Sequence, residues 1–162
     1  MKTIISIFLF FALVSCKQQT AEISKLQDRI KVLEAQVANS YKPGFGELMS
    51  SVQAHHAKLW FAGIHENWKL AEFEVHEIME VLDAVKIYQN EREESKLIDM
   101  MHPALDSISS VIKKKELSSF KDSYTYLTTT CNNCHLETKF EYNIVKIPEF
   151  QQFSNQGFKI NP

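Results

Sequence analysis

Apolar residues recur at three- and four-residue intervals along most of the chain, a periodicity that predicts amphipathic helices. After residue 45, four such stretches cover about 46–64, 67–85, 94–114 and 118–134. Gly63 and Asn67 mark the end of the first stretch, and Asn67 suits the N-cap of the second. Pro103 interrupts the third, which is therefore kinked or begins near that proline. Four long helices with short joins favour an all-α, antiparallel, up-and-down four-helix bundle.

A shorter periodic segment precedes the bundle. Its apolar positions follow the 3-4-3-4 spacing of a heptad seam: Ile23, Leu26, Ile30, Leu33 and Val37. Such a seam buries nothing on an isolated helix, so it should pair with another chain or lie on the body of the protein. Because it covers only about two and a half heptads, a helical stalk and a surface for homo-oligomerisation remain alternatives. Pro43 and Gly44 end this segment.

The N-terminus has the pattern of an export signal. Residues 4–14 form an apolar run after Lys2, too short to span a bilayer as a mature helix. The run ends Leu13-Val14-Ser15-Cys16, which resembles the bacterial lipoprotein signal, in which the cysteine carries the lipid. The alternative is an ordinary secretory peptide with a cysteine there by chance. The resemblance implies a protein of the bacterial cell envelope, anchored by lipid at Cys16 and facing the periplasm.

These boundaries predict four parts: a signal peptide at 1–15, a lipid-anchored stalk and linker at 16–44, the bundle at 45–141, and an irregular tail at 142–162 that packs on the bundle. Lys17 and Gln18 follow the anchor, without the Asp that marks inner-membrane retention in some bacteria, so the outer membrane is the favoured location.

Composition and charge narrow the class of protein. Hydrophobic residues make up 44% and charged residues 23%, which is enough for a packed core and excludes a disordered chain. Lysine and arginine number 18 against 20 acidic residues, so the chain has no broad basic surface for nucleic acid. There are only 4 Gly and 4 Pro, which fits long elements with few turns.

The segment Cys131-Asn132-Asn133-Cys134-His135 matches Cys-x-x-Cys-His, the attachment site of c-type haem. On a helix, positions 131, 134 and 135 share one face, so two thiols can bond the vinyl groups while the imidazole ligates the iron. The motif predicts one covalent haem c with His135 as an axial ligand. The alternatives without haem are a thiol redox pair, or a copper or zinc site that includes His135.

From about residue 46 to 140 the chain resembles the four-helix cytochromes c, that is, cytochrome c-prime and its low-spin relatives. The haem motif of that family lies near the end of the last helix, as Cys131 to His135 does here. The resemblance implies a basic residue against the haem four positions after the ligand histidine, where this chain has Lys139 and the family more often has Arg. It also implies that Met49, near the start of the first helix, is the sixth iron ligand of a low-spin form.

The sixth ligand separates the candidate functions. Ligation by Met49 makes an electron carrier. If the helix is rotated so that apolar Leu48 faces the iron instead, the site is five-coordinate and binds a gas. His56 is the rival ligand, about 10 Å along the helix from Met49. Met49 and His56 each also have an ordinary interpretation as core residues.

We therefore expect an exported, membrane-anchored c-type cytochrome that passes single electrons between redox partner proteins and is not an enzyme. The first alternative is a five-coordinate protein of the cytochrome c-prime type that binds NO or CO. The second alternative is a lipoprotein without haem that acts through thiols or a metal.

Overall fold

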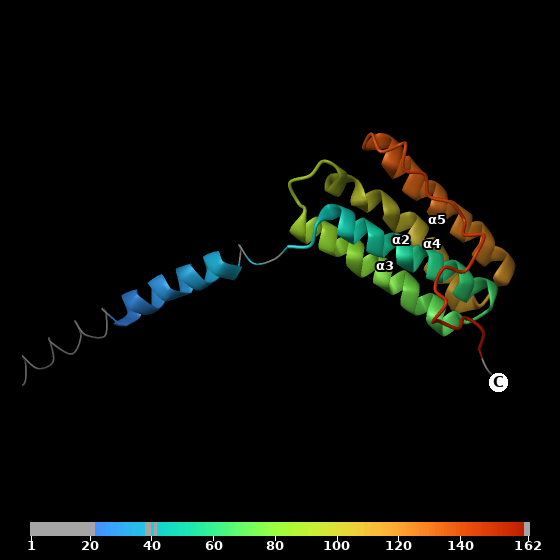
Figure 1. Cartoon of the computed structure of the whole chain (residues 1–162), viewed down its shortest axis with the longest axis horizontal. Helices are drawn as coiled ribbons and strands as arrows, with labels where there is room; N and C mark the ends of the chain where they lie inside the picture. The colour runs from blue at the N-terminus through green and yellow to red at the C-terminus, as the bar shows by residue number, and fades with distance from the viewer. Residues whose placement is uncertain (1–21, 38–39, 41, 161–162) are drawn as a thin grey trace, which may run out of the picture. The chain divides into compact units, whose positions relative to one another are not determined.

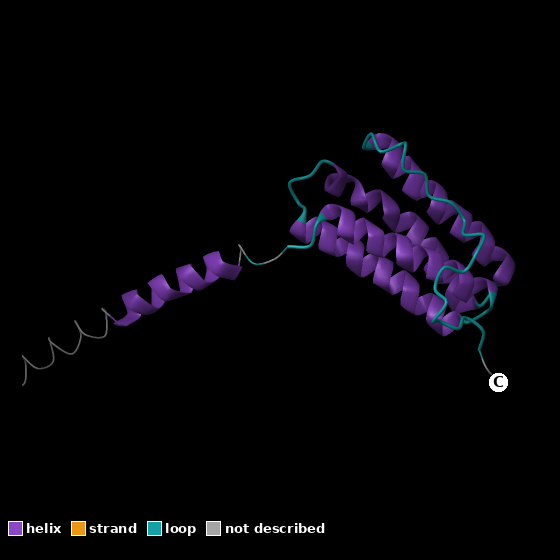
Figure 2. Cartoon of the chain, in the orientation of Figure 1, coloured by secondary structure: helices purple, strands orange, loops and turns teal. Residues whose placement is uncertain are grey.

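The computed structural model describes residues 22–37, 40 and 42–160. The predicted signal peptide and Cys16 lie outside these residues. The chain divides into two compact units, Met1–Lys42 and Pro43–Pro162. The regular structure of the described residues is helical throughout, without a strand (Figure 2), so the prediction of an all-α protein is confirmed.

In the described part of the first unit, a helix spans residues 22–37. The five apolar residues of its heptad seam are between 48% and 72% exposed. Within the described part of this unit, the helix therefore buries none of its seam.

The second unit has four long helices that lie side by side (Figure 1). In chain order its elements are α2 (Phe45–Ile64), α3 (Trp68–Tyr88), the 3₁₀ helix η1 (Glu94–Met101), α4 (His102–Lys114) and α5 (Leu117–Glu137). Helix α2 packs mainly on α3, and α4 packs on α5, while α3 also contacts α4. The core consists of the apolar faces that the periodicity predicts, with Leu59, Ile78, Leu105 and Tyr124 among its most deeply buried residues.

The helix boundaries follow local chemistry. Asn67 caps α3 by accepting the Leu70 N–H on Oδ1 at 3.3 Å, as predicted. The third stretch is divided: η1 precedes α4, and Pro103 lies in the first turn of α4, where the missing N–H is not needed. Helix α5 begins at Leu117, one residue before the predicted fourth stretch.

Three helices end at a residue in the left-handed backbone conformation that usually favours glycine. These residues are Glu66 after α2, Lys115 after α4 and Lys139 after α5, with φ of 56°, 59° and 64°. None of these three positions is a glycine. The sequence nevertheless predicts the ends of α2 and α4 correctly, at residues 64 and 114, whereas α5 continues to Glu137, beyond the predicted residue 134.

Helices α2 and α5 meet at close range where α2 ends and α5 begins. A Cβ placed on Gly63 would lie 2.0 Å from Cζ of Phe120, so glycine is required for the ring to lie against the α2 backbone. One turn further along α5, the Tyr124 hydroxyl donates to the His56 carbonyl at 2.8 Å. Gly63 thus has a packing role inside α2, in addition to lying near the end of this helix.

The tail returns over the helices after α5 (Figure 1). Phe158 is buried, with its ring centroid 5.6 Å from that of Phe61. The Asn67 side chain donates to the Phe158 carbonyl at 3.1 Å. Among the described residues, none of the helices combines the length and apolar character needed to cross a membrane.

The contact at Gly63 makes a stability prediction. Gly63→Ala should lower the free energy of unfolding by about 1–3 kcal/mol, because the added methyl overpacks the Phe120 ring. Gly46→Ala is the matched control, since a Cβ there meets open space, and its better helix propensity should add up to about 1 kcal/mol. Urea unfolding followed by circular dichroism measures both. Equal stability of the two variants would contradict the close packing of α2 and α5.

Candidate functional site

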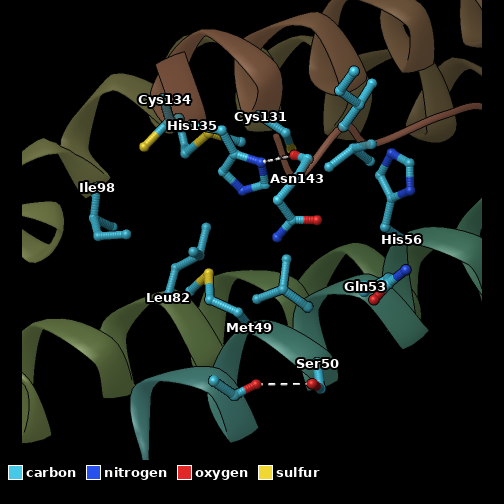
Figure 3. A pocket seen from close by; sticks show the side chains of 15 residues that line it. Met49, Ser50, Gln53, His56, Leu82, Ile98, Cys131, Cys134, His135 and Asn143 are labelled. Carbon is cyan, nitrogen blue, oxygen red and sulfur yellow. Dashed lines mark hydrogen bonds between the residues drawn. The ribbon is translucent and has the colours of Figure 1, made fainter. Parts of the chain in front are cut away.

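A cavity of about 210 Å³ lies between the start of α2 and the end of α5 (Figure 3). Five side chains that the sequence singled out line it together: Met49, His56, Cys131, Cys134 and His135. The rest of the wall is mainly apolar and includes Val52, Leu82, Ile98, Met101, Ile144 and Val145. Residues that are more than seventy positions apart in sequence thus meet at one site.

The two cysteines enter the cavity from α5, and both are free thiols. Burial raises the pKa of Cys131 to about 12, with a smaller contribution from nearby Cys134. Burial also raises the pKa of Cys134, and Glu94 adds to that effect. Both groups are therefore protonated near neutral pH, which makes them weak nucleophiles and poor candidates for thiol exchange.

The ring of His135 is held by a hydrogen bond to the tail. Its Nδ1 lies 2.5 Å from the backbone carbonyl oxygen of Asn143 (Figure 3). Because a carbonyl only accepts, Nδ1 must carry the proton and donate. The neutral ring then has its free lone pair on Nε2, which is the arrangement that second-shell carbonyls give to metal-ligating histidines.

The position of Asn143 depends on a second contact, which we call the Asn132 clamp. The Asn132 side chain donates to the Val145 carbonyl at 2.9 Å and accepts the Val145 N–H at 2.8 Å. The sequence does not single out Asn132 or Asn143. Asn132 and Asn133 are the same residue type in the motif, and Asn133 is exposed, so residue type alone does not separate them.

The turn after α5 directs the tail back toward the motif. Lys139 donates its N–H to the Leu136 carbonyl at 3.2 Å, and Phe140 donates to the His135 carbonyl at 2.7 Å. This pair of bonds is a Schellman motif, with Lys139 in its left-handed position. The Lys139 side chain is exposed and is not part of the cavity wall, so the structure does not bring it to the other predicted site residues.

The wall opposite the motif is formed by α2. Met49 projects into the cavity from this helix (Figure 3), whereas neighbouring Leu48 is buried in the core and does not line it. Met101 is a second thioether in the wall, and it was not singled out from the sequence. Its position inside an apolar stripe gives no sequence signal that separates it from other core residues.

His56 lines the cavity but already has a partner for each ring nitrogen. Its Nδ1 lies 2.9 Å from the Tyr124 hydroxyl and its Nε2 lies 3.0 Å from Oγ1 of Thr128. The side chain is only 3% exposed, and burial lowers its pKa to about 4. These contacts describe a neutral core histidine with satisfied hydrogen bonds, and they leave neither nitrogen free for a metal.

A metal site made by the protein alone finds no support. In residues 22–37, 40 and 42–160, no group of three or more His, Cys, Asp or Glu side chains is arranged to hold a metal ion. The cysteines and His135 share a wall without forming such a group.

No protein-family model, curated protein or solved structure matches this chain.

The Asn132 clamp makes a local prediction. Asn132→Ala should lower the free energy of unfolding by about 1–2 kcal/mol, because two hydrogen bonds to Val145 are lost. It should also speed hydrogen exchange of residues 143–147. Asn133→Ala is the matched control, since Asn133 is the exposed x residue of the same motif and its change should stay within about 0.5 kcal/mol. Unaltered exchange in Asn132→Ala would rule out the clamp.

The buried state of His56 makes a pH prediction. The unfolded chain takes up a proton near pH 6.5 and the folded chain only near pH 4, so the unfolded state is favoured as the pH falls between these values. Acidification over this window should cost about 3 kcal/mol of stability from this residue. His56→Gln, measured by urea unfolding at each pH, should remove that loss, while exposed His76→Gln should keep it. A His56→Gln profile parallel to wild type would refute the assignment.

Proposed function

We propose that this chain is a c-type cytochrome that transfers single electrons and is not an enzyme. One haem c would be bonded to Cys131 and Cys134, and His135 and Met49 would ligate its iron. The observation that carries the proposal is the cavity in which both thiols and the imidazole of the motif face a thioether from α2. This arrangement supports the low-spin form of the site, which the resemblance to the relatives of cytochrome c-prime implies.

The residues present fit such a cofactor. When bound, haem iron supplies one-electron chemistry at a potential set by its ligands and surroundings. His135 would offer Nε2, and the Asn143 carbonyl would make that ring more basic through its bond to Nδ1. The apolar wall would lower the local dielectric constant. Because the cavity is smaller than pockets that enclose a whole ligand, part of the cofactor would face solvent, where a redox partner can approach.

We also propose that the four long helices form an antiparallel up-and-down bundle. Two observations support this topology. Gly63 near the end of α2 meets Phe120 near the start of α5. Met49 near the start of α2 lines the same cavity as His135 near the end of α5.

The proposed location and partners of the protein are based on its sequence. We propose a lipid anchor at Cys16, a periplasm-facing position at the cell envelope, preferably at the outer membrane, and redox partner proteins associated with that membrane. The support is the lipoprotein-like segment Leu13 to Cys16 together with the haem motif, because haem attachment by thioether bonds suits an exported protein. Lys139, exposed beside the motif, remains a proposed contact to the haem edge.

Three alternatives have less support. Thiol exchange is disfavoured because burial raises the pKa of both cysteines. A five-coordinate iron that binds NO or CO needs an apolar residue in place of a ligand, and Leu48, the candidate for that place, lies in the core. His56 is disfavoured as a ligand because both of its nitrogens are engaged.

The first test is haem attachment. The chain, expressed with cytochrome c maturation factors, should keep haem staining on a denaturing gel, because thioether bonds survive denaturation. Cys131→Ala and Cys134→Ala together should remove the stain. An unstained wild-type band would refute every haem-based function proposed here.

The second prediction concerns Met49. The reduced wild-type spectrum should not change under carbon monoxide, because the sixth position is filled, whereas reduced Met49→Ala should bind the gas. Met101→Leu is the matched control, since it removes the other thioether of the cavity wall at nearly constant volume and should behave as wild type. Gas binding by the wild-type protein would instead favour the cytochrome c-prime type of function. Low-spin bands that survive Met49→Ala and vanish in His56→Gln would make His56 the ligand.

A further inference from the structure

The helix of residues 22–37 carries a row of apolar side chains that the described part of its own unit does not cover. Ile23, Leu26, Ile30, Leu33 and Val37 are 48–72% exposed. Ile30, Leu33 and Val37 also border a shallow apolar groove with Glu34. In proteins, most of the stability of a helix comes from packing of its apolar face, so a partner that buries this row would stabilise the helix.

We propose that this helix pairs with the same helix of a second copy of the chain, as a parallel two-stranded coiled coil. The first argument is the identity of the seam residues. Isoleucine occupies the a positions 23 and 30, and leucine occupies the d positions 26 and 33. This combination favours parallel dimers over higher oligomers.

The second argument is charge complementarity. With Ile30 at a, Arg29 is at g and Glu34 at e of the next heptad. In a parallel pair, Arg29 meets Glu34 of the partner subunit, and the twofold symmetry makes this contact twice. Within one helix, residues five apart do not face each other, so the pairing has no use in the monomer. An antiparallel pair would bring g against g and e against e, and would lose both contacts.

A membrane surface is the competing partner for an apolar helix face. Helices that lie in the lipid interface present a wide apolar face and a basic polar face. Here the seam is narrow, and acidic residues such as Asp28 and Glu34 are mixed with the basic ones. The charge pattern therefore fits a second helix better than a lipid surface.

The length of the seam predicts a weak dimer. It is shorter than the three or four heptads of a stable coiled coil. The proposed lipid at Cys16 would hold both copies on one surface and raise their effective concentration. Parallel pairing would also place both N-termini together, as two anchors in one membrane require. The pairing itself depends on neither the anchor nor the haem.

The experiment uses the full chain in non-ionic detergent with micelles in large excess, and measures the monomer–dimer equilibrium by sedimentation. Arg29→Glu and Glu34→Arg should each weaken the dimer by about tenfold, because attraction becomes repulsion at two symmetric contacts. The double reversal should restore wild-type affinity. Ile30→Asp should abolish the dimer, while circular dichroism of the remaining helices stays unchanged.

Orientation is tested by oxidative cross-linking. Leu33→Cys, at a d position, should give a disulfide-linked dimer in a parallel pair. Asp28→Cys, at the outer f position, should not give such a dimer. The wild-type chain, oxidised in the same way, measures any cross-linking through the cysteines that the chain already contains.

Three results would overturn the proposal: a chain that stays monomeric at every concentration, a double reversal that fails to restore affinity, or a dimer that survives Ile30→Asp. A further contrary result is a Cys16→Ser chain that binds phosphatidylglycerol vesicles as a monomer and is released by Ile30→Asp, since the row would then face lipid. Absence of haem staining would refute the proposed function but leave these measurements valid.

Discussion

The close approach of α2 and α5 is the constraint on which the rest of the structure depends. The Phe120 ring lies directly on the backbone of Gly63, because no side chain intervenes there. From that contact, α5 continues along α2 through Tyr124 and its bonds to His56. At the other end the two helices enclose a cavity with Met49 on one wall and the Cys-x-x-Cys-His motif on the other. The contact between Gly63 and Phe120 therefore fixes how far apart α2 and α5 lie and how they are rotated. This in turn sets how Met49 and the Cys-x-x-Cys-His motif face each other.

The same packing gives the two histidines of the cavity different surroundings. His56 is close to the contact between α2 and α5, where burial makes its charged form costly and polar groups occupy both ring nitrogens. His135 lies beyond that region, and a single carbonyl engages only its Nδ1. A buried histidine with both ring nitrogens hydrogen-bonded has a structural role. A histidine with only one ring nitrogen hydrogen-bonded keeps the other nitrogen available to bind a ligand.

The tail contributes to the site because it returns over α5. The left-handed backbone at Lys139 reverses the chain, and the Asn132 clamp then holds Val145 two residues from the carbonyl that orients His135. Asn132, between the two cysteines of the motif, thus helps to set the position of the His135 ring through the tail. The segment usually regarded as a spacer is a structural part of the site.

Periodicity and spacing in the sequence predicted the helices, one helix cap and the shared face of the motif residues. The apolar repeat predicted the helices, Asn67 marked a cap, and the spacing of Cys131, Cys134 and His135 within about one turn put them on one face. Such features depend only on residues a few positions apart. The choice of Met49 over Leu48 depends on how α2 is rotated against its neighbours, and two adjacent helical positions differ by about 100° of rotation. The close packing at Gly63, the engagement of His56, the contribution of Met101 and the return of Asn143 to His135 also required tertiary structure, because each depends on contacts between segments far apart in the chain.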